Sequence, residues 1–147
     1  MARQELPAVG YNTARGQYSG DVLLREVSKL RVEPGAKHLG VFDVDLYAGR
    51  LNFIFGIAQI GGDFALISLK RLDYAPVQLS RDEREALLFE RALKEAIHEL
   101  GHTFGLGHCH NKQCVMSFSN SLSEVDEKGT DFCEEHRIQL LRILGHL

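Results

Sequence analysis

Residues 98–108 read HELGHTFGLGH, which places three histidines and one glutamate within eleven residues. Successive residues of a helix are offset by about 100°, so His98 and His102 stand one turn apart on one face and both rings reach a single ion. Glu99 lies beside them and points toward the remaining coordination position without occupying it. This set of residues is typical of a zinc site in which a carboxylate acts as general base on zinc-bound water.

The second half of the stretch, residues 103–108, predicts a third ligand and the turn that positions it. Gly105 is where the chain must leave the helix, because glycine adopts the left-handed conformation without a steric penalty. The turn then brings His108 back toward the ion as a third imidazole. We therefore predict a catalytic zinc held by His98, His102 and His108, with Glu99 as the catalytic residue.

A second group of metal-ligating residue types follows directly along the chain. Its members, two pairs with four and two intervening residues, are Cys109, Cys114, Cys133 and His136. Thiolates and an imidazole with no vacant position are typical of a closed, structural zinc site. Two alternatives are open. His110 could take the fourth position in place of His136, or the cysteines could be ordinary buried thiols that bind no metal. An odd number of cysteines argues against a disulfide framework.

The composition is that of one ordinary globular domain. The chain has 147 residues, 44% of them hydrophobic, which suffices for a core without disulfides. A formal charge of −3 without a basic stripe excludes a nucleic-acid partner. No apolar run approaches the roughly 18 residues of a membrane span and no leader precedes the domain, so we expect no membrane partner and a cytoplasmic protein. We also expect a monomer.

Hydrophobic periodicity predicts an α+β fold. Apolar residues at helical spacing indicate a first helix over 21–30, which ends before a proline and a glycine. Runs rich in valine, isoleucine and phenylalanine indicate strands over 39–46, 51–55 and 64–69. A last helix is expected over 131–144, with the final cysteine and the histidine three residues later one turn apart.

A long helix is predicted between the last strand and the histidine stretch. Ser80 and Glu83 have the spacing of a capping box, which marks its start. Its apolar stripe is expected to pack on the core and consists of Phe89, Ala92, Leu93, Ala96, Ile97, Leu100 and Phe104. The histidines and Glu99 lie outside that stripe, so the helix is expected to present them to a cleft.

The continuation of the histidine stretch resembles one known family. It runs through Cys109, then CVM at 114–116 and FC at 132–133. Upstream segments fit the same pattern: VFDVDLY at 41–47, LNFIFG at 51–56 and AQIGG at 58–62. With these features the chain is similar to the archaemetzincins, of the metzincin clan of zinc peptidases, over about residues 11–145.

The resemblance implies a single metzincin-like α+β domain over 1–147. Its upper part, about 1–107, holds a small mixed twisted sheet, the first helix and the active-site helix. Its lower part, about 108–147, holds a structural zinc and the last helix. The family further implies two zinc ions per chain, one catalytic and one structural, and Met116 in a turn beneath the catalytic metal. Because 51–56 resembles the family's cleft-lining strand, the expected substrate contacts are Asn52, Phe53, Phe55 and Gly56.

The chain departs from the family pattern in two places. The family's downstream pair is usually Cys-x-x-Cys, whereas His136 stands three residues after Cys133, and we expect it to replace the fourth cysteine. Family members usually begin with a strand before the segment at 11–18, so the first strand of the sheet is expected to be missing.

These residues predict a zinc-dependent peptidase. Glu99 is expected to activate a zinc-bound water, which attacks a peptide bond of a peptide or small protein substrate. Two other functions stay open at this point. A zinc amidohydrolase acting on a small molecule uses the same four residues, whereas a catalytically silent, zinc-stabilised interaction domain leaves Glu99 without a purpose.

Overall fold

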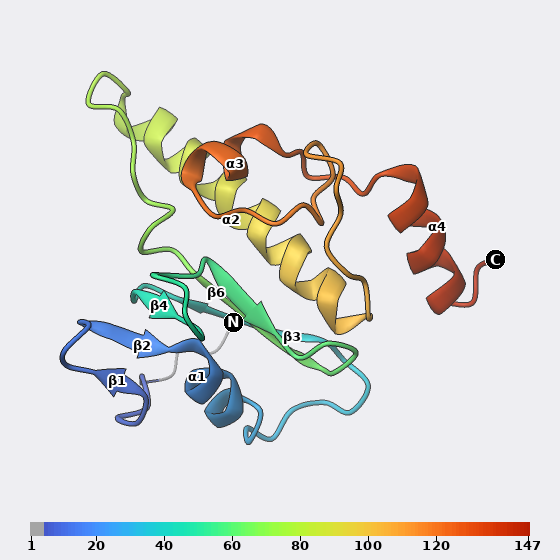
Figure 1. Cartoon of the computed structure of the whole chain (residues 1–147), viewed down its shortest axis with the longest axis horizontal. Coiled ribbons are helices and arrows are strands. Elements are labelled where there is room, and N and C mark those ends of the chain that lie inside the picture. The colour runs from blue at the N-terminus through green and yellow to red at the C-terminus, as the bar shows by residue number, and fades with distance from the viewer. Residues whose placement is uncertain (1–4) are drawn as a thin grey trace.

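The computed structural model describes residues 5–147, which form two small mixed β-sheets and four helices (Figure 1). The strands are β1 (Tyr11–Asn12), β2 (Gln17–Ser19), β3 (His38–Phe42), β4 (Leu46–Tyr47), β5 (Gly56–Ala58) and β6 (Phe64–Ser68). The helices are α1 (Gly20–Val27), α2 (Arg81–Thr103), α3 (Leu122–Glu127) and α4 (Glu134–Ile143). The predicted α+β class is confirmed, with the strands divided between two sheets.

Each sheet has three strands. The first has the order β1-β2-β4, in which β2 is antiparallel to β1 and parallel to β4. The second has the order β3-β6-β5, in which β6 is parallel to β3 and antiparallel to β5. Within residues 5–147, β5 pairs with no strand other than β6, so its outer edge is unpaired.

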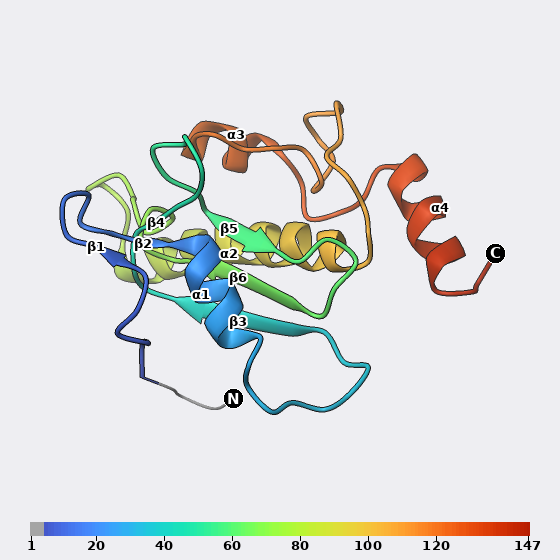
Figure 2. The ribbon, with the colours of Figure 1, turned by 60° about the horizontal axis from the view of Figure 1, so that its bottom comes forward.

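Strand β6 is the centre of the core because helices cover both faces of its sheet. Its five residues are all buried. Phe64 and Leu66 pack with Leu23 and Leu24 of α1. Side chains alternate between the faces of a strand, so Ile67 points the other way, toward α2. Figures 1 and 2 show α1 and α2 on opposite sides of this sheet.

Residues 51–55 do not form the predicted strand, which begins only at Gly56. Ile54 alone of this segment pairs with a strand, in an isolated bridge to Leu46 of β4, and side chains from β2 and the turn before it hold the backbone at Asn52. The carbonyl oxygen of Asn52 accepts hydrogen bonds from Arg15 Nη2 at 3.1 Å and from Gln17 Nε2 at 2.8 Å. The prediction of a continuous strand was wrong because side chains distant in sequence, and not a neighbouring strand, bind the backbone at Asn52, although the apolar residues suit a strand.

The strand predicted over 39–46 is interrupted after β3, and its last residue, Leu46, begins β4 in the other sheet. The remaining predicted elements agree with the structure in type and differ at their ends. The first helix closes at Val27 and the last begins at Glu134, with Cys133 as its N-cap residue. Helix α3 was not predicted, although Ser121 Oγ accepts a hydrogen bond from Glu124 N in the manner of an N-cap. Within residues 5–147 no helix combines the length and apolarity needed to cross a lipid bilayer.

Helix α2 begins and ends as predicted. Ser80 Oγ accepts a hydrogen bond from Glu83 N at 3.2 Å, and Glu83 Oε2 accepts one from Ser80 N at 2.7 Å, which completes the capping box. The helix ends at Thr103, and Gly105 has a φ of +89°, the left-handed conformation expected there.

The predicted apolar stripe is wrong for the first half of α2. Phe89 is 70% exposed, whereas Arg91 and Lys94 are buried. The first turns of α2 extend beyond the sheet (Figure 1), and α3 packs on their polar side instead. There the Arg91 guanidinium donates two hydrogen bonds to Asp126 at 2.7 and 2.8 Å, and Lys94 Nζ donates to the carbonyl oxygen of Val125 at 3.2 Å.

Candidate active site and metal centres

The three histidines of the motif converge on one point. His98 and His102 lie on α2, and His108 follows the turn at Gly105. The Nε2 atoms of His98 and His102 are 3.2 Å apart, and one nitrogen of each of the three rings lies within 4.8 Å of the others. Two nitrogens bound at about 2.0–2.1 Å to a tetrahedral zinc are roughly 3.3 Å apart, so the spacing fits this ion.

Carbonyl oxygens fix the orientation of two of these rings. His98 Nδ1 donates to the carbonyl oxygen of Val115 at 2.8 Å, and His102 Nδ1 donates to that of Leu106 at 2.7 Å. A carbonyl only accepts, so Nδ1 carries the proton and Nε2 keeps its lone pair for a metal.

Burial keeps the three imidazoles neutral. It lowers the pKa of His98 to about 2, and the charge of Lys128 contributes to this shift. Burial also lowers the pKa of His102 and of His108. A neutral imidazole is the form that coordinates a metal, so the environment prepares all three rings for binding.

Glu99 lies beside the histidines and is 5% exposed. Burial, assisted by the charge of Glu95, raises the pKa of Glu99 well above its ordinary value, and Lys128 offsets part of this effect. A β-carbon added to Gly56 would stand 2.7 Å from Oε1 of Glu99, so β5 runs directly against the carboxylate. A carboxylate with a raised pKa has the increased proton affinity that a general base needs.

A cavity of about 230 Å³ opens over these groups. Its walls come from α2, from His108, from residues 118–119, and from the segment that runs into β5. Of the predicted substrate contacts, Phe53, Phe55 and Gly56 line the cavity. Asn52 does not line the cavity. The lining residues bring β5, Glu99 and the histidines together in one cavity.

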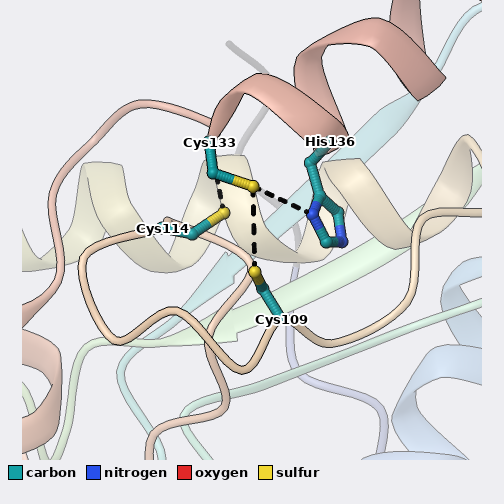
Figure 3. A group of neighbouring side chains, drawn as sticks. All are labelled: Cys109, Cys114, Cys133 and His136. Carbon is teal, nitrogen blue, oxygen red and sulfur yellow. Dashed lines mark hydrogen bonds between the residues drawn. The ribbon is translucent and has the colours of Figure 1, made fainter.

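The four predicted ligands of the second site also converge (Figure 3). Cys133 Sγ lies 3.8 Å from Cys109 Sγ and 3.3 Å from His136 Nδ1. All four ligand atoms, including the sulfur of Cys114, lie within 4.8 Å of one another. Sulfurs bound at about 2.3 Å to a tetrahedral zinc are roughly 3.8 Å apart, which matches the sulfur pair.

The structure distinguishes between the two histidines considered for the fourth position. His136 Nε2 donates to the carbonyl oxygen of Gly107 at 3.1 Å, so its Nδ1 lone pair faces Cys133. His110 is exposed and lies outside the group. The backbone hydrogen bond from His136 lowers the pKa of the Cys133 thiol to about 7, which favours the thiolate that a metal binds.

Met116 is fully buried, in an apolar cluster that includes Cys109, Cys114 and Cys133. A β-carbon on Gly101 would stand 2.5 Å from Met116 Sδ, so the side chain packs against the turn of α2 that carries His98 and His102. The contact lies on the helix that carries the histidines, and the place of Met116 in a turn beneath the metal stays a prediction.

Comparison with known proteins identifies the family. The model of Peptidase family M54 matches residues 4–142. The chain belongs to this family. Archaemetzincin of Methanocaldococcus jannaschii is 47% identical over 135 residues, which cover 92% of this chain and 72% of that protein. Archaemetzincin of Methanopyrus kandleri is 46% identical over 131 residues, 89% of this chain and 70% of that protein.

Solved structures of the family have the same fold. The crystal structure of archaemetzincin from Methanopyrus kandleri superposes with a TM-score of 0.85 at 45% identity, covering 96% of this chain and 73% of that one. Archaemetzincin from Archaeoglobus fulgidus gives a TM-score of 0.79 at 38% identity, covering 95% and 79%. The chain is therefore a zinc metallopeptidase that acts on peptide bonds, and the amidohydrolase and interaction-domain alternatives are not favoured.

Two charged residues at or near the cavity were not predicted from the sequence. Glu95 lines the cavity one turn before Glu99, and its Oε1 lies 2.7 Å from Nζ of Lys128, which is fully buried. Burial raises the pKa of Glu95, while Lys128 acts in the opposite direction. Glu95 could have been predicted, because it stands four residues before Glu99 and so lies on the same helix face. The sequence around Lys128 does not indicate that its side chain is buried.

Proposed function

We propose that His98, His102 and His108 hold the catalytic zinc of this peptidase and that Glu99 is its general base. The observation that carries this assignment is the convergence of the three ring nitrogens beside a buried carboxylate in one cavity. The carbonyl partners of His98 and His102 support it, because they leave the Nε2 lone pairs free for a metal.

The groups of this site have different roles in hydrolysis. When bound, zinc polarises the scissile carbonyl and acidifies a water molecule. Glu99 accepts the proton of the attacking water on its carboxylate and delivers it to the nitrogen of the leaving amine. Burial raises the pKa of Glu99, which increases the affinity of its carboxylate for the proton that it accepts.

The substrate is an extended segment of a peptide or small protein. Gly56, Ile57 and Ala58 of β5 line the cavity, and β5 is the outer strand of its sheet. A peptide lying along this edge forms backbone hydrogen bonds of the kind that β-strand addition uses, irrespective of its side chains. Its scissile bond then passes between the histidines and Glu99.

The second zinc is structural and is held by Cys109, Cys114, Cys133 and His136. The converging ligand atoms and the absence of a cavity-lining member among these four support a closed site. Such a site ties the segment after His108 to the start of α4. Action as a monomer in the cytoplasm stays a prediction.

A library of short randomised peptides tests the proposal. The zinc-loaded protein is incubated with the library, with and without a chelator, and the products are identified by mass spectrometry. We expect new amino termini that appear only without chelator and that disappear when Glu99 is replaced. Cleavage that persists after removal of zinc, or in a Glu99 variant that retains zinc, contradicts the assignment.

A further inference from the structure

The three histidines of the proposed zinc site are not held in the same way. His98 and His102 are 4% and 7% exposed, and each donates a hydrogen bond from Nδ1 to a carbonyl oxygen. His108 is exposed, and within residues 5–147 no group forms a hydrogen bond with its ring. A histidine that binds a metal almost always has a partner on its second ring nitrogen, which fixes the direction of the ring. A contact of another kind must therefore orient the ring of His108.

The backbone around His108 is held on both sides. The carbonyl oxygen of Gly107 accepts a hydrogen bond from His136 Nε2 at 3.1 Å, and Cys109 N donates to the carbonyl oxygen of Met116 at 2.9 Å. These bonds fix the position of the main chain from which the imidazole extends. What they leave free is rotation about the side-chain bonds of His108.

Phe118 lies where it can restrict that rotation. Cys109 pairs with Ser117 in an isolated parallel bridge, and successive side chains of an extended chain point to opposite faces. His108 and Phe118 each adjoin one member of this pair, so both point to the other face. The centroids of their rings are 5.2 Å apart, with 49° between the ring planes. Both residues line the cavity that contains Glu99.

The segment that carries Phe118 is itself fixed. Ser117 is buried, and its carbonyl oxygen accepts a hydrogen bond at 3.2 Å from Nζ of the fully buried Lys128. Ser117 N donates to the carbonyl oxygen of Cys114 at 2.9 Å. Phe118 is nevertheless 42% exposed, although burial of a phenylalanine side chain is favourable. A phenyl ring on a fixed backbone, exposed beside a metal ligand, is suited to a role in the site and not in the core.

Resting on the proposed function, we propose that Phe118 is the positioning residue for the third zinc ligand, His108. The phenyl ring packs against the imidazole and restricts its rotation, so the imidazole is oriented before the ion binds. A side chain that is already ordered in its bound conformation raises affinity, because less conformational entropy is lost on binding. Phe118 has no atom that binds zinc, so it acts through His108.

The rate at which zinc leaves the loaded protein tests this role. Release is followed with an excess of a chelator that changes colour when it binds zinc. The closed cysteine site should release its ion in a slower phase, because it has no vacant position at which a chelator can enter. His102→Ala identifies the phase of the histidine site, since this variant lacks one ligand of that site and should lose the amplitude of that phase.

Phe118→Ala should accelerate the histidine-site phase about three- to tenfold, the effect of one aromatic contact. The phase of the cysteine site should keep its parental rate. Phe118→Trp should release zinc at close to the parental rate, because it keeps an aromatic ring at an exposed position that has room for a larger one. Phe89→Ala is the matched control, since Phe89 is 70% exposed on α2 and does not line the cavity. Both of its phases should be parental.

The outcomes separate the positioning role from the function on which it rests. A parental rate for the histidine-site phase in Phe118→Ala overturns the role of Phe118, as does release from Phe118→Trp that is as fast as from the alanine variant. Equal acceleration of both phases in Phe118→Ala also overturns it, since this would indicate a general loosening of the fold. If the parental protein shows no phase that His102→Ala removes, the proposed zinc site itself is wrong.

Discussion

The backbone of Gly56 lies in direct contact with the side chain of Glu99. A β-carbon on Gly56 would stand 2.7 Å from both Cγ and Oε1 of Glu99, and equally close to the carbonyl oxygen of Leu66. The contact between β5 and the Glu99 carboxylate therefore leaves no room for any side chain at position 56. Gly56 lies outside the left-handed region, so its requirement is for room and not for backbone freedom.

Replacing Gly56 by alanine should therefore damage catalysis without removing the metal. The methyl group must displace Glu99 or push β5 away from β6, and a misplacement of the base near 1 Å costs about 10²-fold in rate. We expect kcat to fall by that order while elemental analysis still finds the parental zinc content. A variant with parental kcat would show that the Glu99 carboxylate works from another position.

Glu99→Gln should retain the fold and the zinc and lose nearly all hydrolysis. The amide preserves the shape of the side chain but accepts no proton, and loss of a general base lowers the rate by about 10²–10⁴-fold. The rate is measured on a peptide selected from the library. Glu85→Gln is the control, because Glu85 is an exposed residue on the same helix, and it should hydrolyse the peptide at the parental rate.

The purified chain should carry two zinc ions, one for each group of converging ligands. His136→Ala should lose one ion and destabilise α4, because three thiolates alone leave the tetrahedral site open. His136→Cys should keep both ions, since sulfur replaces nitrogen with only a small change in bond length. His110→Ala should also keep both. Elemental analysis in zinc-supplemented buffer and thermal melts measure these effects, and zinc loss in the His110 variant alone would mean that the fourth ligand is misassigned.

Lys128→Met should destabilise the protein strongly, because it leaves the buried Glu95 carboxylate without its counter-ion. Removing one partner of a buried ion pair costs about 3–5 kcal/mol. Adding Glu95→Gln should recover much of that free energy of unfolding, since no charge then stays buried. Urea denaturation of the zinc-loaded variants measures both effects, with the exposed Lys112→Met as control. Equal stability of the single and double variants would show that the two charges do not interact.

The sequence predicts those parts of the site that are local in the chain. His98, Glu99 and His102 share one helix face, and Gly105 turns the chain toward His108, so eleven residues contain the geometry of the first centre. The start of α2 could also be predicted from the sequence, because the capping box is a four-residue pattern.

Features that depend on distant partners could not be predicted. Residues 51–55 look like a strand, but Arg15 and Gln17 hold their backbone from about 35 positions upstream. Lys128 is fully buried because it pairs with Glu95 on another helix, which no local periodicity records. Arg91 and Lys94 of α2 are likewise buried where α3 packs on them. In each case the tertiary partner, and not the local pattern, decides the environment.

His108 and Cys109 are consecutive residues, so a single peptide bond joins the two ligand groups. The same short stretch is held from its other side, where Cys109 N donates to the carbonyl oxygen of Met116 at 2.9 Å. We expect an ion at either centre to order this shared backbone, so that an ion arriving at the other centre meets a segment that is already ordered. The two affinities would then be coupled, and by reciprocity each ion would raise the affinity for the other by the same factor. Under zinc starvation the chain should pass from doubly loaded to empty with few half-loaded molecules, which would make zinc supply a cooperative control of the enzyme.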